Sequence, residues 1–285
     1  MTPATLARPF QQVDVFTETA LMGNPLAVVL DGTGLTTEQM QRFTDWTNLS
    51  EATFVLPPTH PEADYQLRIF CPGRELPFAG HPTLGSCHAW LRAGGKSKGD
   101  QVVQECGVGL VRIRRDGDRL AFAAPPLRRG GPLDEAELAR MTAGLGLARS
   151  DIVAHAWCDN GPQWRGVMLR SAQQVLALRP DSALLAGMEI GVVGPCAAGA
   201  ECAFEVRAFF PGHGGLAEDP VTGSLNAAIA QWLMGAGLAP TRYIASQGTA
   251  LGRAGRVHVE QDLHATGTIW IGGQSVTCIE GQVWL

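Results

Sequence analysis

Runs of apolar residues along this chain predict strands more often than helices. In the first half, short runs rich in β-branched and aromatic residues predict strands at 13–16, 27–30, 53–56 and 65–71. In the second half, similar runs predict strands near 152–157, 164–169, 189–193 and 202–209. Short strands punctuated by glycine are expected across 243–285, including a hairpin turn at 252–256.

Helices are expected at only a few places. Thr36 and Gln39 have the spacing of a capping box, which predicts a helix running to about Thr47. The apolar segment LGSCHAWL follows His81 and ends at a Gly-Gly pair, and a second apolar helix is expected over 221–234. Each half therefore has one long apolar helix among several strands. This pattern predicts an α/β fold in which each half forms a curved mixed sheet around a central helix.

The two halves also resemble each other at a spacing of 139 residues. RIFCPG at 68–73 aligns with RAFFPG at 207–212, and the same spacing places Gly80 on Asp219 and Thr83 on Thr222. Two unrelated α/β segments with similar turns are the alternative explanation. The repeat predicts two similar domains, with the stretch at 125–132 as the best linker and the paired loops facing a ligand-binding cleft.

The composition argues against several classes of function. The net charge is −5 with no basic run, which argues against nucleic acid or an anionic membrane as a partner. No apolar stretch is long enough to span a membrane, and the first residues do not form a secretion signal. The seven cysteines are odd in number and include no CxxC pair, so reduced thiols in a cytoplasmic protein without a zinc site are expected.

Two loops that precede helices are candidates for anion binding. Pro82 in AGHP and Pro220 in EDPVTGS are expected at the first position of a helix, where proline is tolerated. Backbone N–H groups at such helix starts bind carboxylates or phosphates. The alternative is an ordinary helix cap, with Asp219 as the N-cap residue. The candidate substrate-binding residues are Gly80, Thr83, Thr222, Gly223 and Ser224.

Proton transfer needs ionisable groups, and three are candidates. His81 and Asp219 lie in the two loops, and His81 could exchange protons near neutral pH. Glu51 lies between a predicted helix and a predicted strand, where partial burial would raise its pKa. The alternatives are a structural histidine and a solvated glutamate. The chain contains no GxGxxG, P-loop, HExxH or GxSxG motif, so no cofactor or metal is expected.

Nearly end to end, these motifs resemble the phenazine-biosynthesis (PhzF-like) isomerase family, whose fold is that of diaminopimelate epimerase. ELPFAGHPTLG at 75–85 and EDPVTGS at 218–224 are the specific segments, supported by Gly23-Asn24-Pro25, Gln247-Gly248 and the segment LSEATF at 49–54. The resemblance implies a first domain at 1–127, to which a strand at 274–285 returns, and a second at 128–273. It also implies a homodimer that needs no cofactor.

The resemblance implies roles for individual residues as well. It makes Glu51 the general acid/base, and it places His81, Asp219 and Ser224 around a small carboxylate-bearing substrate, with Gly80 on the contacting loop. Thiol racemases of the same fold carry a cysteine in each paired loop. At the 139-residue spacing those positions are Gly80 and Asp219, so two-thiol chemistry is not expected. Cys71, where relatives often have Thr, does not replace either thiol.

The expected function is therefore a cofactor-independent isomerase or epimerase. Two alternatives stay open: a small-molecule-binding or protein-interaction module that has lost turnover, and an amino-acid racemase that uses Glu51 and Asp219 as opposed bases.

Overall fold

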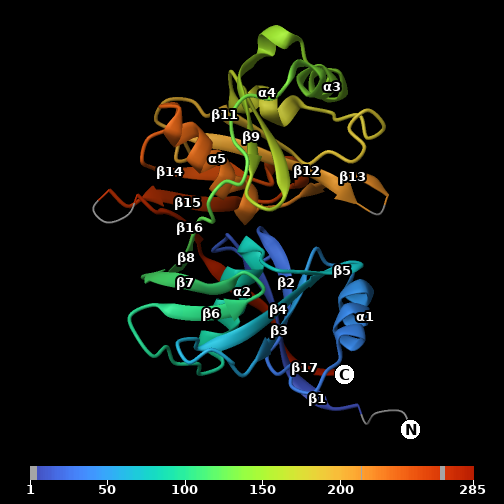
Figure 1. Ribbon diagram of the computed structural model, residues 1–285, viewed down its shortest axis with the longest axis vertical. Helices are drawn as coiled ribbons and strands as arrows, with labels where there is room; N and C mark the ends of the chain where they lie inside the picture. Colours follow the sequence, from blue (N-terminus) through green and yellow to red (C-terminus); the bar gives the residue numbers. More distant parts are fainter. Residues whose placement is uncertain (1–4, 213, 264–266) are drawn as a thin grey trace. The chain divides into compact units, whose positions relative to one another are not determined.

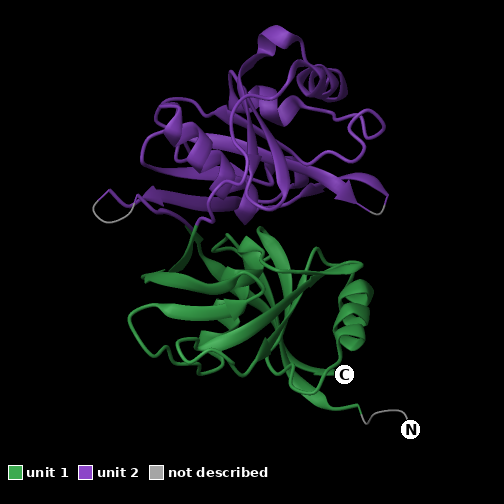
Figure 2. Ribbon diagram, in the orientation of Figure 1, with its two compact units in different colours: residues 1–123, 272–285 green, residues 124–271 purple. Residues whose placement is uncertain are grey.

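The computed structural model describes residues 5–212, 214–263 and 267–285. The chain divides into two compact units (Figure 2). Unit 1 comprises Met1–Ala123 and Gly272–Leu285, and unit 2 comprises Ala124–Ile271. Within the described part of the chain, none of the helices has both the length and the apolar character that crossing a membrane requires.

Unit 1 is a mixed sheet with two helices (Figure 1). Its elements are β1 (Ala7–Val15), β2 (Asn24–Val29), α1 (Thr37–Thr47), β3 (Ala52–Leu56), β4 (Tyr65–Cys71), β5 (Arg74–Leu76), α2 (Gly80–Arg92), β6 (Val102–Cys106), β7 (Gly109–Asp116), β8 (Arg119–Ala123) and β17 (Ser275–Trp284). β1 pairs with β17 and β2, and the sheet continues from β2 through β3, β4, β6 and β7 to β8. Within it, β2–β3 and β4–β6 are parallel.

Helix α2 is the buried centre of unit 1. Nearly all its residues from Gly80 to Ala89 are buried, and the helix contacts β1, β2, β3, β6, β8 and β17. Gly85 permits this close packing, because a Cβ there would lie 2.7 Å from Leu26 and 2.8 Å from Val15. The capping box of α1 forms as the sequence indicates, with Thr36 accepting from the backbone of Gln39.

Unit 2 repeats this arrangement. Its elements are α3 (Glu135–Leu145), a 3₁₀ turn (Arg149–Asp151), β9 (Ile152–Asp159), β10 (Gln163–Leu169), α4 (Ala172–Ala177), β11 (Ile190–Pro195), β12 (Phe204–Gly212), β13 (Gly215–Asp219), α5 (Gly223–Gly235), β14 (Arg242–Gln247), a 3₁₀ turn (Thr249–Leu251) and β15 (Gly255–Gln261). The last strand before β17, β16 (Ile269–Gly273), spans the division between the units.

Strand pairing confirms the internal repeat. β9–β10 is antiparallel, β10–β11 parallel, β11–β12 antiparallel and β12–β14 parallel. The same sequence of directions runs through β1, β2, β3, β4 and β6 of unit 1. In both units a short hairpin strand, β5 or β13, precedes the central helix, α2 or α5. The expected α/β architecture, a mixed sheet around a central helix in each half, is therefore confirmed.

The constant 139-residue spacing is wrong beyond the hairpin. Phe70 pairs with Glu75 in unit 1, and Phe209 pairs with Glu218 in unit 2. The second hairpin is therefore longer, and the spacing afterwards is 143 residues. The counterpart of Gly80 is Gly223, since each is the first residue of its helix. Asp219 ends β13 instead, and Thr222 is an N-cap residue, so neither is the counterpart assigned from the sequence.

The two prolines do not occupy the first helical positions expected for them. Pro82 is the third residue of α2, and Pro220 precedes Thr222, the N-cap of α5, by two residues. Asp219 is likewise not the N-cap residue. The conclusion about thiols survives the shift in spacing, because the first residues and N-caps of both helices contain no cysteine.

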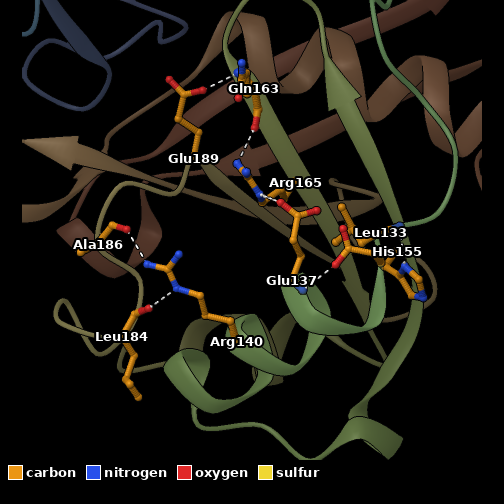
Figure 3. Close-up of polar contacts among 10 residues, drawn as sticks. Leu133, Glu137, Arg140, His155, Gln163, Arg165, Leu184, Ala186 and Glu189 are labelled. Atoms are coloured by element: carbon orange, nitrogen blue, oxygen red, sulfur yellow. Dashed lines mark hydrogen bonds and ion pairs between the residues drawn. The ribbon is translucent and has the colours of Figure 1, made fainter.

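Helix α3 was missed by the sequence analysis. Asp134 caps it by accepting from the backbone of Glu137, a pattern readable three residues apart in the sequence. Figure 3 shows the polar contacts that hold α3 against the rest of unit 2. Arg165 of β10 donates to Glu137 at 2.8 Å, and Arg140 donates to the carbonyl oxygens of Leu184 and Ala186. The helix is short and amphipathic, so its tertiary contacts contribute much of its stability.

Candidate active site

Glu51 of unit 1 lies where helix α1 has ended and strand β3 begins. The helix ends at Asn48, whose left-handed backbone (φ 55°) turns the chain towards the strand. Glu51 directly precedes Ala52, and β3 pairs in parallel with β2. Its side chain is 17% exposed, and its Oε2 atom is buried. The glutamate is therefore mostly enclosed rather than solvated.

His81, the second residue of α2, faces this carboxylate. Its Nε2 atom lies 3.3 Å from Oε2 of Glu51, so the structure brings these two predicted residues together. Burial lowers the pKa of His81 to about 3. At neutral pH the ring is uncharged, and the contact joins a neutral imidazole to a carboxylate rather than two opposite charges. This distance leaves room for the geometry to tighten once substrate is bound.

Asn24 is a member of this cluster that the sequence analysis did not assign to the site. It begins β2 and is fully buried, and its Nδ2 atom lies 3.3 Å from Nδ1 of His81. The Gly23-Asn24-Pro25 motif was a usable signal, because a polar residue between Gly and Pro in an otherwise apolar region suggests a specific contact. The structure thus groups Asn24, His81 and Glu51 inside unit 1.

The first turn of α2 differs from an ordinary capped helix. Ala79 is the N-cap residue and provides no side-chain hydrogen bond to the turn. Thr83 is fully buried, and its hydroxyl accepts from the side-chain amide of Gln104 at 3.1 Å. Gly80 and His81 therefore begin a helix whose positive dipole end is not satisfied by a capping side chain.

The loop before α5 in unit 2 is held by a dense polar network. Thr222 donates its hydroxyl proton to the Asp219 carboxylate at 2.6 Å. Gln247 accepts from the Thr222 backbone and donates to the Thr222 hydroxyl and the Asp219 carbonyl. The Asn226 amide donates to the same Gln247 oxygen at 2.8 Å. Gln247 is fully buried, so this network fixes Asp219 and Thr222 together.

Ser224, the second residue of α5, is fixed by two donors. The indole Nε1 of Trp164 donates to Ser224 Oγ at 3.2 Å, and the Asn160 amide donates to the Ser224 carbonyl at 2.8 Å. An indole N–H only donates, so the Ser224 hydroxyl accepts from it and keeps its own proton for another acceptor. Together with the backbone N–H groups of the helix start, this makes the turn suited to an anion.

Two further observations concern possible metal ligands and the Cys71 thiol. None of its His, Cys, Asp and Glu residues form a group of three that could hold a metal ion. Burial raises the pKa of the Cys71 thiol, and the charge of Glu51 raises it further. Cys71 is therefore a protonated thiol at neutral pH.

This chain is similar over nearly its whole length to known proteins. Residues 13–281 match the family model for phenazine biosynthesis-like proteins (PhzC-PhzF). The chain is 36% identical to antisense-enhancing sequence 1 of Schizosaccharomyces pombe, covering 97% of this chain and 98% of that protein. It is 33% identical to trans-2,3-dihydro-3-hydroxyanthranilate isomerase of Pseudomonas aeruginosa, covering 96% of this chain and 98% of the enzyme. A PhzF-family crystal structure from Enterococcus faecalis superposes with a TM-score of 0.80 at 24% identity, covering 98% of this chain and all of that one.

Proposed function

This chain belongs to the phenazine biosynthesis-like (PhzC-PhzF) family, and from that premise we propose that it is a cofactor-independent isomerase or epimerase. In the proposed reaction, the Glu51 carboxylate removes a proton from a carbon of a small carboxylate-bearing substrate. The resulting Glu51 carboxylic acid then returns the proton to another carbon of the same molecule. The electron pair left on the first carbon shifts into the substrate, so no oxidant or reductant is consumed.

The observation that carries this proposal is the contact between Glu51 Oε2 and His81 Nε2. A general base works well when it is held in one orientation and partly removed from water. Glu51 meets both conditions, since it is 17% exposed and its buried oxygen faces a neutral ring nitrogen at 3.3 Å.

Unit 2 would supply the anion-binding groups. The start of α5 offers the backbone N–H groups that follow Thr222 and a Ser224 hydroxyl oriented as a donor. We propose that each helix start binds an anionic group: these groups of α5 a carboxylate, and the first turn of α2 beginning at Gly80 the negative charge that develops beside Glu51. Asp219 would hold Thr222 in place and complete the polar surroundings.

Proton exchange with solvent tests the proposal. We would incubate the protein in deuterium oxide with trans-2,3-dihydro-3-hydroxyanthranilate and with a panel of amino- and hydroxy-substituted carboxylates, and follow deuterium incorporation by mass spectrometry. We expect the Glu51→Gln variant to exchange at least about 100-fold more slowly than the parent. Glu62→Gln is the matched control, because the Glu62 side chain is 61% exposed and pairs with Arg112 at the surface.

The outcomes separate the competing functions. Equal exchange rates in Glu51→Gln and the parent would contradict the proposed role of Glu51. Binding of a carboxylate without any exchange across the panel would favour a module without turnover. Interconversion of enantiomers, detected by chiral chromatography and abolished in both Glu51→Gln and Asp219→Asn, would favour the two-base racemase.

A further inference from the structure

Each unit presents one asparagine to the second residue of its central helix. In unit 1 Asn24, the first residue of β2, contacts His81. In unit 2 Asn160, from the turn between β9 and β10, contacts Ser224. His81 and Ser224 hold the same position in α2 and α5. The partner of Asn160 is a main-chain carbonyl, however, whereas the partner of Asn24 is a titratable ring, so only the unit 1 contact acts on a group that carries protons.

The contact with Asn24 determines where the His81 proton lies. A neutral imidazole has one nitrogen that donates and one that accepts. The Asn24 Nδ2 group only donates, so a hydrogen bond to the His81 Nδ1 atom 3.3 Å away requires Nδ1 to accept, which places the ring proton on Nε2. The contact with Glu51 favours the same tautomer. Oε2 of the Glu51 carboxylate lies 3.3 Å from Nε2. Because an ionised carboxylate only accepts, a proton on Nε2 suits this contact. Both neighbours thus favour one tautomer.

We propose that Asn24 is a positioning residue that holds His81 as its Nε2–H tautomer, so that His81 donates to Oε2 of Glu51. This inference rests on the proposed function, in which Glu51 moves the proton. Oε2 is buried and lies 3.3 Å from Nε2 of the ring, whereas the Glu51 side chain as a whole is 17% exposed. Oε1 is then the oxygen that takes up and returns the proton, while Oε2 stays fixed through both steps.

The turn that carries Asn24 is built rigidly enough for this role. The Asp14 carboxylate accepts from the Gly23 backbone at 2.8 Å inside the protein. A Cβ at Gly23 would lie 2.2 Å from the Val15 carbonyl oxygen, so only glycine allows the strand ends to approach this closely. Asn24 follows directly and is fully buried. Its amide is therefore held in place before the substrate arrives, as positioning requires.

Nitrogen NMR of the ¹⁵N-histidine-labelled full-length protein tests the inference without any substrate. The His81 signals are identified by their loss in His81→Gln. At neutral pH we expect the wild-type ring to carry its proton on Nε2. In Asn24→Asp the new carboxylate accepts from Nδ1, and we expect the proton to move to Nδ1 or the ring to become doubly protonated. Asn160→Ala, the matched control, removes the equivalent amide of unit 2 and is expected to leave the His81 signals unchanged.

Activity provides the second readout. We expect Asn24→Asp to lower kcat about 100-fold or more with little change in KM, because the wrong tautomer misplaces the base rather than the substrate. Wild-type His81 protonated on Nδ1, or Asn24→Asp with a ring that is protonated on Nε2 alone, would overturn the inference. The wild-type spectrum can overturn the inference even if the variant does not fold. Full exchange in Glu51→Gln would instead contradict the proposed function, whatever tautomer His81 adopts.

Discussion

The starts of α2 and α5 show how one architecture supports two kinds of chemistry. Both helices begin with glycine and have an asparagine from the neighbouring hairpin against their second residue. In unit 1 that second residue is a buried neutral histidine beside a carboxylate. In unit 2 it is a serine, contacted by an indole and an amide, neither of which titrates near neutral pH. The comparison teaches that repetition fixes positions, while the side chains placed there differ, and this difference underlies the proposal of proton transfer in unit 1 and anion binding in unit 2.

The β12–β13 hairpin of unit 2 and the β4–β5 hairpin of unit 1 also differ, in how deeply their ion pairs are buried. Stability measurements can test the effect of that difference. Arg207 and Glu218 form a bidentate pair with side chains only 6% and 12% exposed, whereas their counterparts Arg68 and Glu75 are 25% and 39% exposed. We expect Glu218→Gln to lower the free energy of unfolding by about 3 kcal/mol, since it leaves a buried cation without its partner.

The matched substitution in unit 1 should have a much smaller effect. Glu75→Gln is expected to cost less than about 1 kcal/mol, because solvent screens an exposed pair. Chemical denaturation monitored by circular dichroism measures both variants. Equal losses of stability would show that the two hairpins are equivalent despite their different burial.

Kinetics of variants at the starts of α2 and α5 test whether unit 1 transfers the proton and unit 2 binds the anion. We expect His81→Ala to lower kcat on the order of 100-fold, because it removes the group that orients Glu51. Ser224→Ala is expected to raise KM about tenfold with a smaller effect on kcat, as loss of an anion-binding hydrogen bond should. Steady-state kinetics with the substrate found by the exchange assay separates the two effects. The reverse pattern would contradict the assignment of proton transfer to unit 1.

The pH dependence of stability should report the neutral state of His81. Its folded-state pKa is lowered to about 3, below the ordinary value of 6.5. The unfolded chain therefore binds a proton at this residue first as the pH falls, and the native state loses stability. We expect a decline of up to about 1.4 kcal/mol per pH unit from this residue between pH 6.5 and pH 3, and none above pH 6.5.

Comparison with His81→Gln isolates this contribution. The variant has no group that titrates at position 81, so its stability should fall less steeply over the same pH window. Thermal denaturation at a series of pH values supplies the measurement. Parallel pH profiles of the parent and the variant would show that His81 is not held neutral by burial.

The smallest expected effect concerns the indole that orients Ser224. Trp164→Phe keeps the ring but removes the N–H that donates to Ser224, and we expect KM to rise about fivefold, roughly the value of one neutral hydrogen bond. Trp157→Phe is the matched control, because the Trp157 indole nitrogen makes no hydrogen bond within the described residues. An equal change of KM in both variants would contradict the orienting role of Trp164.

Much of the fold was determined by the sequence itself. Strand β4 begins and ends at the predicted residues, and α1 has the predicted capping box. These elements are readable because local alternation, capping and glycine placement encode them over a few neighbouring positions. Strands β6 to β8 and the helices α3 and α4 were missed, since they are short or mixed in polarity and are stabilised by contacts with distant residues.

For the candidate site, the sequence supplied the residues and the tertiary structure supplied their partners. Glu51 and His81 were identified from the sequence and its resemblance to the family, but their contact spans thirty positions of the chain. The hairpin that shifts the repeat from 139 to 143 residues became visible only through strand pairing, which pairs Glu75 and Glu218 with equivalent phenylalanines. Asn24 gained its role in the same way, because a hydrogen bond between side chains depends on where the backbone brings them. Local sequence specifies many of the elements, whereas the packing of α2 against β1, β2 and β3 brings His81 to its neighbours Asn24 and Glu51.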